Sequence, residues 1–197
     1  MNLVSFEPTN IFGATAAPSN VIISGKCSFS SAGTVGITGI TLKTNSDYAL
    51  SVTGSVASVV ILDRCFIQCS NSSGIQLSSS SASSVVQLNE CCGDLNTTGI
   101  AIFDHSGAGQ FRLIKSLFSN SGASTTNNTV SGTGSLLPNY VALGNGTTLS
   151  SSSSMTGSFL DFNTGNSTAL TTSSTASVNI QQCVISTGTG SAVSIGS

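Results

Sequence analysis

The chain has 197 residues, of which only 6% are charged, and its formal net charge is −2. This length is sufficient for one domain with a substantial core. Typical soluble domains carry about a quarter charged residues, so the surface here must instead be nearly neutral and rich in hydroxyl and amide groups. The five basic residues do not cluster, which excludes the basic footprint that nucleic-acid binding requires. No run of 18 apolar residues occurs, so we expect no membrane insertion.

Residues 1–19 precede the first regular repeat and are predicted to be an N-terminal lead-in or cap. They contain neither a charged n-region nor an apolar core, so no secretory signal is visible. A protein released with a virus particle would need no such signal. Residues 20–197 are predicted to form one repetitive domain.

Asparagine recurs along this domain at an almost constant interval. The intervals are 25, 26, 25, 24, 25 and 21 residues. The series consists of Asn20, Asn45, Asn71, Asn96, Asn120, Asn145 and Asn166. A fixed period of this size is the signature of a repeat architecture.

Two series of apolar residues keep the same phase as the asparagines. The first is Ile37, Leu62, Leu88, Leu113, Leu137 and Phe159. The second is Leu50, Ile75, Ile100, Leu149 and Leu170. Both lie in short runs that alternate apolar and polar residues, which is typical of strands, and Ser, Thr, Gly and Asn clusters between the runs indicate turns. Segments 121–135 and 150–158 have little apolar content and are predicted to be longer loops.

Three to five strand residues at each turn of about 25 residues predict an all-β fold, a single-stranded parallel β-helix of about seven or eight coils. One coil cannot bury its own inward side chains, so the coils must stack, with about 4.8 Å between neighbouring strands. Equivalent asparagines then lie above one another and can hydrogen-bond amide to amide, as in a structural ladder. This pattern resembles the asparagine ladder of right-handed parallel β-helix proteins.

The same register aligns Arg64, Glu90 and Lys115, whose charges alternate in sign. Opposite charges on neighbouring strands of a sheet attract each other weakly. We interpret this row as support for the register of the coils, and the alternative is a patch that binds a charged ligand.

The six cysteines do not show the spacing of a zinc site, so no metal ligand is predicted. Buried free thiols in the core are one interpretation. A disulfide between stacked coils, Cys65–Cys91 or Cys69–Cys92, is the alternative, because neighbouring strands are close enough for a bridge.

The acidic residues allow two carboxyl pairs of the kind that glycoside hydrolysis uses, Asp63 with Glu90 and Asp94 with Asp104. Asp104 is also followed by His105, which could form an acid–base pair. An acidic residue at the end of a strand more often caps a turn, so no catalytic residue is assigned, and no cofactor site is predicted.

Exposed aromatic rings are common in carbohydrate-binding surfaces. Tyr48 and Tyr140 lie at the predicted starts of strands and are the candidates for glycan contact. Most phenylalanines, Phe159 included, lie on the strand series and are expected to face the core.

The coil period, the asparagine series, the Ser/Thr/Gly-rich turns and the low charge together resemble the β-helical segments of bacteriophage tail fibres and tailspikes. This resemblance implies a structural virion protein, found on the virion or an extracellular surface, that attaches to a host receptor or surface glycan without catalysis. It also implies a homotrimer, or contacts with neighbouring virion proteins. The alternatives are a polysaccharide-degrading β-helix enzyme and a non-viral surface adhesin.

Overall fold

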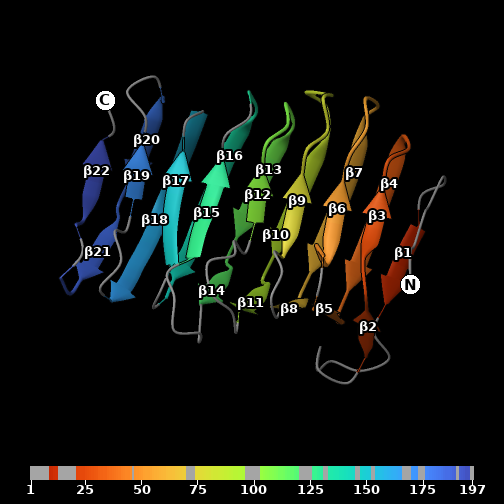
Figure 1. The fold of residues 1–197 in the computed structure, drawn as a ribbon, viewed down its shortest axis with the longest axis horizontal. Coiled ribbons are helices and arrows are strands. Elements are labelled where there is room, and N and C mark those ends of the chain that lie inside the picture. The colour runs from red at the N-terminus through yellow and green to blue at the C-terminus, as the bar shows by residue number, and fades with distance from the viewer. Residues whose placement is uncertain are drawn as a thin grey trace.

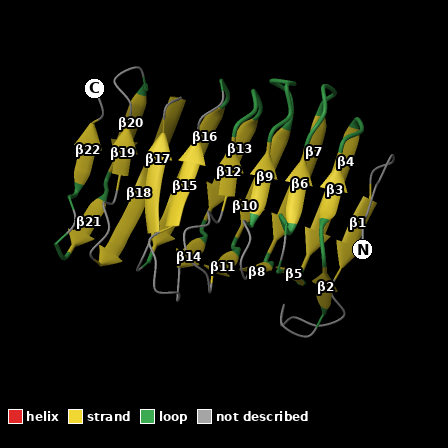
Figure 2. Cartoon of the chain, in the orientation of Figure 1, coloured by secondary structure: helices red, strands yellow, loops and turns green. Residues whose placement is uncertain are grey.

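In the computed structural model, every regular element among the described residues is a β-strand, and no helix occurs there that could cross a membrane (Figure 2). All described strand pairs are parallel, and the strands stack side by side along one axis (Figure 1). The chain is therefore a parallel β-solenoid, as the sequence predicts. The structure describes residues 9–12, 21–45, 47–69, 74–95, 103–119, 126–130, 133–144, 147–151, 154–165, 170–172, 176–189 and 191–195.

Each coil contributes a strand to each of three faces. The first face contains β1 (Thr9–Phe12), β4 (Gly33–Thr38), β7 (Ser58–Asp63), β10 (Val85–Asn89), β13 (Gln110–Ile114), the first parts of β16 (Ser135–Leu143) and β18 (Ser154–Gly165), and β20 (Val178–Gln181). The second face contains β2 (Ile22–Ser24), β5 (Thr41–Thr44), β8 (Phe66–Cys69), β11 (Cys92–Leu95), β14 (Leu117–Ser119), the second parts of β16 and β18, and β21 (Val184–Thr187). Because β16 and β18 run across the corner between these faces, the two faces form one 14-stranded sheet.

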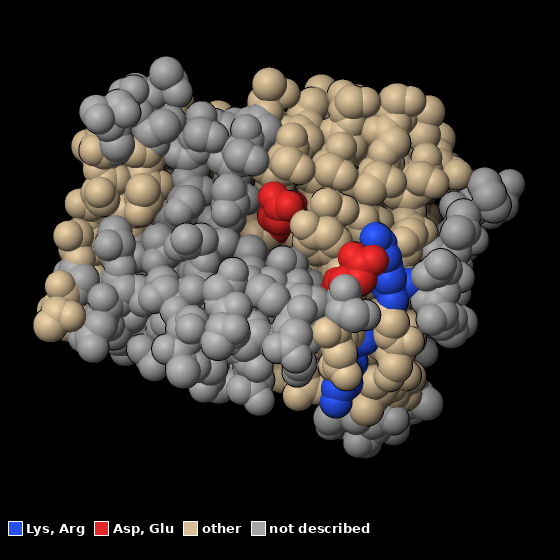
Figure 3. All heavy atoms as spheres, viewed as in Figure 1, with Lys and Arg blue, Asp and Glu red and all other residues tan. Residues whose placement is uncertain are grey.

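The third face is a separate eight-stranded sheet. It contains β3 (Cys27–Phe29), β6 (Leu50–Val52), β9 (Ile75–Leu77), β12 (Phe103–His105), β15 (Thr126–Val130), β17 (Thr147–Ser151), β19 (Leu170–Thr172) and β22 (Val193–Ile195). Few charged side chains appear in the view of Figure 3, and most of them gather toward the N-terminal end of the solenoid. On this face, the described surface is thus mostly uncharged.

The length of a coil changes along the solenoid. Paired residues on the first face are 25 or 26 positions apart at each step from β1 to β16. The next step, from β16 to β18, is clearly shorter, since Leu136 is paired with Met155. The step from β18 to β20, which pairs Met155 with Val178, is also shorter than the regular period. The predicted period therefore holds for about five turns, fewer than the seven or eight predicted.

The core is filled by side chains that point inward from all three faces. On the first face one inner row consists of Val35, Val60, Val86, Phe111, Leu136 and Met155, all buried. The second inner row consists of Ile37, Leu62, Leu88, Leu113 and Pro138. The predicted apolar series is thus correct as far as Leu113 and wrong afterwards, because Pro138 and not Leu137 continues the row.

A left-handed backbone residue marks the corner between the first and second faces in seven successive coils. The φ angles of the non-glycine residues there lie between 49° and 56°. The corner row consists of Gly39, Arg64, Glu90, Lys115, Tyr140, Phe159 and Gln182. L-residues pay a steric penalty in this region of φ, so the repeated bend is imposed by the strands that enter and leave it.

Asn45 is the one member of the predicted asparagine ladder among the described residues. It is exposed directly after β5 and borders a small hollow of about 160 Å³ with Lys43. The other six asparagines of the series lie outside the described residues, so the ladder stays a prediction. Within the predicted lead-in 1–19, β1 pairs with β4, and the rest lies outside the described residues. The loops predicted at 121–135 and 150–158 are wrong in part, because residues 126–130 form β15 and residue 135 begins β16, while residues 150–151 end β17 and residues 154–158 belong to β18.

Candidate functional site

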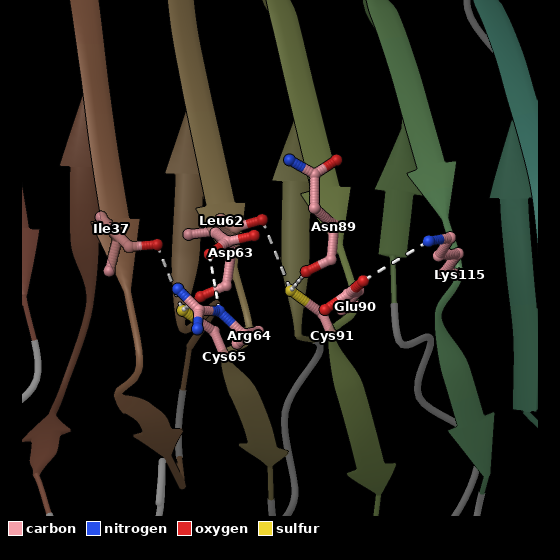
Figure 4. Close-up of polar contacts among 9 residues, drawn as sticks. All are labelled: Ile37, Leu62, Asp63, Arg64, Cys65, Asn89, Glu90, Cys91 and Lys115. Carbon is pink, nitrogen blue, oxygen red and sulfur yellow. Dashed lines mark hydrogen bonds and ion pairs between the residues drawn. The ribbon is translucent and has the colours of Figure 1, made fainter. Parts of the chain in front are cut away.

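The corner row changes character along the solenoid axis. In the middle coils it carries Arg64, Glu90 and Lys115, and Figure 4 shows Glu90 turned toward Lys115. Lys115 Nζ lies 3.6 Å from Glu90 Oε1, whereas Arg64 Nε donates to the Asp63 carboxylate at 2.9 Å. The predicted charge row therefore exists, but Arg64 pairs within its own coil.

In the next two coils the same corner positions are occupied by aromatic residues. The rings of Tyr140 and Phe159 are parallel within 5°, and their centroids are 4.4 Å apart. The two side chains are nevertheless 52% and 40% exposed. The expectation that Phe159 faces the core is wrong, because the left-handed bend at this position turns its side chain outward. The stacked pair forms an apolar platform on the outer edge of the solenoid, which we call the aromatic corner.

A hollow of about 320 Å³ lies on the first face next to the aromatic corner. It is formed by side chains of three consecutive strands, β16, β18 and β20. Its lining residues are Leu137, Pro138, Asn139, Thr156, Gly157, Ser158, Asn179 and Gln181. We call this hollow the polar groove.

A local interruption of the strand pairing explains why the polar groove is where it is. Paired positions between β16 and β18 include Leu136 with Met155 and Asn139 with Ser158, but no pair is formed at Leu137 or Pro138. Proline has no backbone N–H to donate to a neighbouring strand. Opposite it stands Gly157, where a Cβ atom would lie only 2.5 Å from the Pro138 carbonyl oxygen. The ladder is thus interrupted where one residue lacks a donor and the other lacks a side chain.

The walls of the polar groove offer hydrogen-bonding groups without charge. Asn139, Asn179 and Gln181 contribute amides, and Thr156 and Ser158 contribute hydroxyls. Ser158 Oγ donates to Asn139 Oδ1 at 3.2 Å, which uses the amide oxygen of Asn139 and not its amide nitrogen. Among the described residues that line the groove, none is charged. Such a surface can accept and donate hydrogen bonds at the same time.

Tyr48, the other tyrosine predicted to contact a glycan, lies in a different environment. Its hydroxyl donates to Asp104 Oδ2 at 3.1 Å, and Lys26 Nζ lies 5.8 Å from its ring centroid. Lys26 also pairs with Asp47 at 3.1 Å. Desolvation by burial and the nearby Asp104 carboxylate both raise the pKa of the Tyr48 hydroxyl. Tyr48 is half-buried and its hydroxyl is already hydrogen-bonded to Asp104, so the more exposed Tyr140 is the better candidate for ligand contact.

The carboxyl groups considered for catalysis have structural partners. Asp63 is held by Arg64, Glu90 by Lys115, and Asp104 by Tyr48. The side chain of Asp94 lies outside the described part of the chain. His105 does not form an accessible acid–base pair with Asp104, because its ring is fully buried and neither ring nitrogen has a hydrogen-bond partner of good geometry.

All six cysteines are free in the structure. Cys65 and Cys91 lie in successive coils at the buried position next to the corner, and each Sγ donates to a backbone carbonyl of the preceding coil (Figure 4). Cys69 and Cys92 cannot pair, because Cys69 is buried opposite Leu95 while Cys92 is exposed opposite Phe66. In the described part of the chain no three His, Cys, Asp or Glu residues are placed to hold a metal ion.

Comparison of the chain with protein-family models, with curated proteins and with solved structures gives no match. The fold and the aromatic corner with its polar groove are therefore the basis for a proposed function.

The sequence predicts Tyr140 as an exposed candidate but not Phe159 or the polar groove. A proline within a strand-like segment was the available signal, since proline interrupts a ladder.

Proposed function

We propose that this chain is a structural, non-catalytic component of a virion fibre or spike that attaches to a host surface by binding carbohydrate. The observation that carries the proposal is the exposed, stacked pair Tyr140 and Phe159 beside a groove of amides and hydroxyls. The described fold supports the structural part, since a parallel β-solenoid is a stiff column. The resemblance to tail fibres and tailspikes supports the virion location and a homotrimeric assembly.

The aromatic corner suits carbohydrate because a pyranose ring has an apolar face of C–H groups and an edge of hydroxyls. The apolar face can lie on a rigid aromatic ring, and the hydroxyls need polar partners next to it. Asn139 and Ser158 directly precede Tyr140 and Phe159 in the sequence, so the polar groups border the rings. Both requirements are met on the same three strands.

The test is binding to a panel of immobilised oligosaccharides, compared between the wild type and the double variant Tyr140→Gly, Phe159→Gly. Glycine is chosen because both positions have a left-handed φ, at 55° and 56°, where glycine is unstrained. We expect the double variant to lose at least about tenfold in affinity, or ~1.4 kcal/mol. Arg64→Gly is the matched control, since it has the same backbone conformation in a coil without the platform.

Equal binding by the wild type and the double variant would contradict the proposal, and so would binding to none of the oligosaccharides. Two further measurements test its other parts. We expect no release of reducing sugar from the bound oligosaccharides, because the proposal includes no catalysis. Light scattering should give three times the mass of the 19.7 kDa chain.

A further inference from the structure

We infer that the polar groove selects an uncharged glycan and discriminates against uronate, sialylated and sulfated sugars. This inference rests on the proposed function and adds the ligand class. It follows from four features of the described residues: the uncharged walls, the interrupted floor, the position of the aromatic corner, and the state of the nearest charges.

The walls match a neutral sugar better than an anion. Each hydroxyl of a sugar both donates and accepts hydrogen bonds, and so do the side chains of Asn179, Gln181 and Thr156. An anionic group needs a concentrated set of donors or a cation to replace its water. The described lining residues provide no cation, so an acid group in the groove would lose hydration without a matching partner.

The floor adds depth without adding charge. At Pro138 and Gly157 the strands approach so closely that a Cβ atom on Gly157 would lie 2.5 Å from the proline carbonyl oxygen, and both residues contribute uncharged groups to the lining. A carbonyl oxygen accepts hydrogen bonds from hydroxyl groups and repels carboxylate and sulfate oxygens. The floor therefore favours the same ligands as the walls.

The aromatic corner fixes how the sugar lies. Tyr140 and Phe159 follow Asn139 and Ser158 along the strands, so rings and polar groups form two adjacent rows. Gln181 continues the polar row in the next coil, paired with Ser158. Because the two rings stack face to face, a sugar can place its apolar face on the outer face of one ring, and its edge hydroxyls are then next to this polar row.

The charged side chains nearest to the site lie outside its lining. Arg112, which is paired with the lining residue Leu137, places Nε and Nη2 at 3.2 and 2.6 Å from Gln110 Oε1. Lys115, which precedes Tyr140 in the corner row, pairs with Glu90. On the other side Asp161 is exposed two residues after Phe159. Lys115 is thus paired with a carboxylate. The Arg112 guanidinium keeps its charge, but its two hydrogen bonds hold it toward Gln110 of its own strand. The exposed Asp161 carboxylate repels anions.

The experiment compares probes that differ only in the acid group. Polygalacturonate is measured against its fully methyl-esterified form, and sialyllactose against its carboxyl methyl ester, by titration calorimetry with the full chain. We expect each acidic member to bind at least about tenfold more weakly than its neutral counterpart, equal to ~1.4 kcal/mol. If the neutral members of these pairs are not ligands, the strongest neutral binder of the panel is compared with its sulfated derivative.

Variants locate the effect in the polar groove. Gln181→Leu keeps the size of the side chain and removes its hydrogen bonds, and we expect it to weaken neutral-glycan binding about threefold to tenfold, as one lost hydrogen bond would. Gln87→Leu is the matched control, because Gln87 lies on the same face outside the groove and bonds to Asn89.

The outcomes separate the inference from the function on which it rests. Equal or tighter binding of acidic probes, with the dependence on Tyr140 and Phe159 retained, overturns the inference and leaves glycan attachment standing. Glycan binding that Gln181→Leu does not weaken also overturns it. Binding that does not depend on the aromatic corner overturns the proposed function itself.

Discussion

The coils from β1 to β13 and the coils from β16 to β22 are built on the same three-faced plan but differ in regularity. The first group keeps one nearly constant period, and its first-face ladder is continuous. The second group has shorter steps, from Leu136 to Met155 and on to Val178, and its ladder is interrupted at Pro138. The corner row changes at the same boundary, from charged residues to the aromatic Tyr140 and Phe159.

The comparison shows where the solenoid leaves aromatic rings and polar groups exposed. In the regular coils, polar groups are satisfied by neighbouring coils or side chains, as in the pairs Glu90–Lys115 and Tyr48–Asp104. In the irregular coils, rings, amides and a carbonyl border a hollow. We therefore expect the regular coils to contribute most of the stability, whereas the candidate site lies in the irregular coils. The following predictions test this division.

The largest expected effect is the loss of stability when an inner row of the regular coils is truncated. Leu88→Ala removes a fully buried side chain and should lower the free energy of unfolding by about 3 kcal/mol. Ile180→Ala, in the same inner position of the last first-face strand, should cost less than half as much, because Ile180 is only partly buried. Urea unfolding of both variants measures the difference. Equal losses in the free energy of unfolding would contradict the division into well-packed regular coils and less well-packed irregular coils.

The next effect concerns the interruption of the ladder. Gly157→Ala places a Cβ atom 2.5 Å from the Pro138 carbonyl oxygen, so the strands must separate, at a cost of about 1–3 kcal/mol. The same change disturbs the floor of the polar groove, so we expect weaker binding of neutral glycan as well. Pro138→Ala is the companion variant. It supplies an N–H and should allow the ladder to close, with binding again reduced; unchanged binding in both variants would show that the floor is not part of the site.

His105 is a defect within the regular coils and gives them a pH dependence. Desolvation by burial lowers its pKa below 6.5, while the Gly109 backbone and the Asp104 carboxylate oppose this shift. His105 binds a proton more tightly in the unfolded chain than in the folded one. Its full contribution to the free energy of unfolding is therefore present above the unfolded pKa of 6.5 and is lost as the pH falls through 6.5 toward the folded pKa. Thermal unfolding between pH 8 and pH 4 should show this loss.

Two substitutions assign the pH effect to this ring. His105→Leu removes the titrating group and two buried ring nitrogens without a hydrogen bond of good geometry, so it should stabilise the fold by about 1 kcal/mol at neutral pH and abolish its share of the acid sensitivity. His105→Asn also abolishes the pH effect but keeps a buried polar group, so it should not stabilise. An unchanged pH profile in both variants would place the acid sensitivity elsewhere.

The architecture was predictable because it depends on features that repeat. The rows Ile37, Leu62, Leu88 and Leu113 and the alternating charges Glu90 and Lys115 are visible in the sequence as residues at one phase. Each coil must bury the same inward positions, so periodicity and packing point to the same answer.

The site was not predictable because it depends on the departure from that period. The shortened step between β16 and β18 cannot be aligned with the regular period, so Phe159 was placed in the core series instead of at the corner. The bend itself is also hidden, because Arg64, Glu90 and Tyr140 share a left-handed backbone but no side-chain chemistry. The sequence predicts Tyr140 as a candidate for glycan contact from its residue type and its place at an expected strand start, whereas its stacked partner Phe159 follows only from the register.

The smallest expected effect, and the one that compares both regions at the same position, is the relief of backbone strain at the corner. Glu90→Gly removes the cost of a left-handed L-residue, about 1–2 kcal/mol, but it adds conformational freedom to the unfolded chain and removes an exposed ion pair of little value. We expect a net gain in the free energy of unfolding below about 1 kcal/mol.

Tyr140→Gly, at the same corner position in the irregular coils, should show a similar gain diminished by the loss of ring stacking, about 0.5–1.5 kcal/mol. If Tyr140→Gly is no less stable than the wild type and yet loses glycan binding, the ring is retained for recognition and not for folding. A large loss of stability would instead make the stacked pair part of the solenoid's own packing.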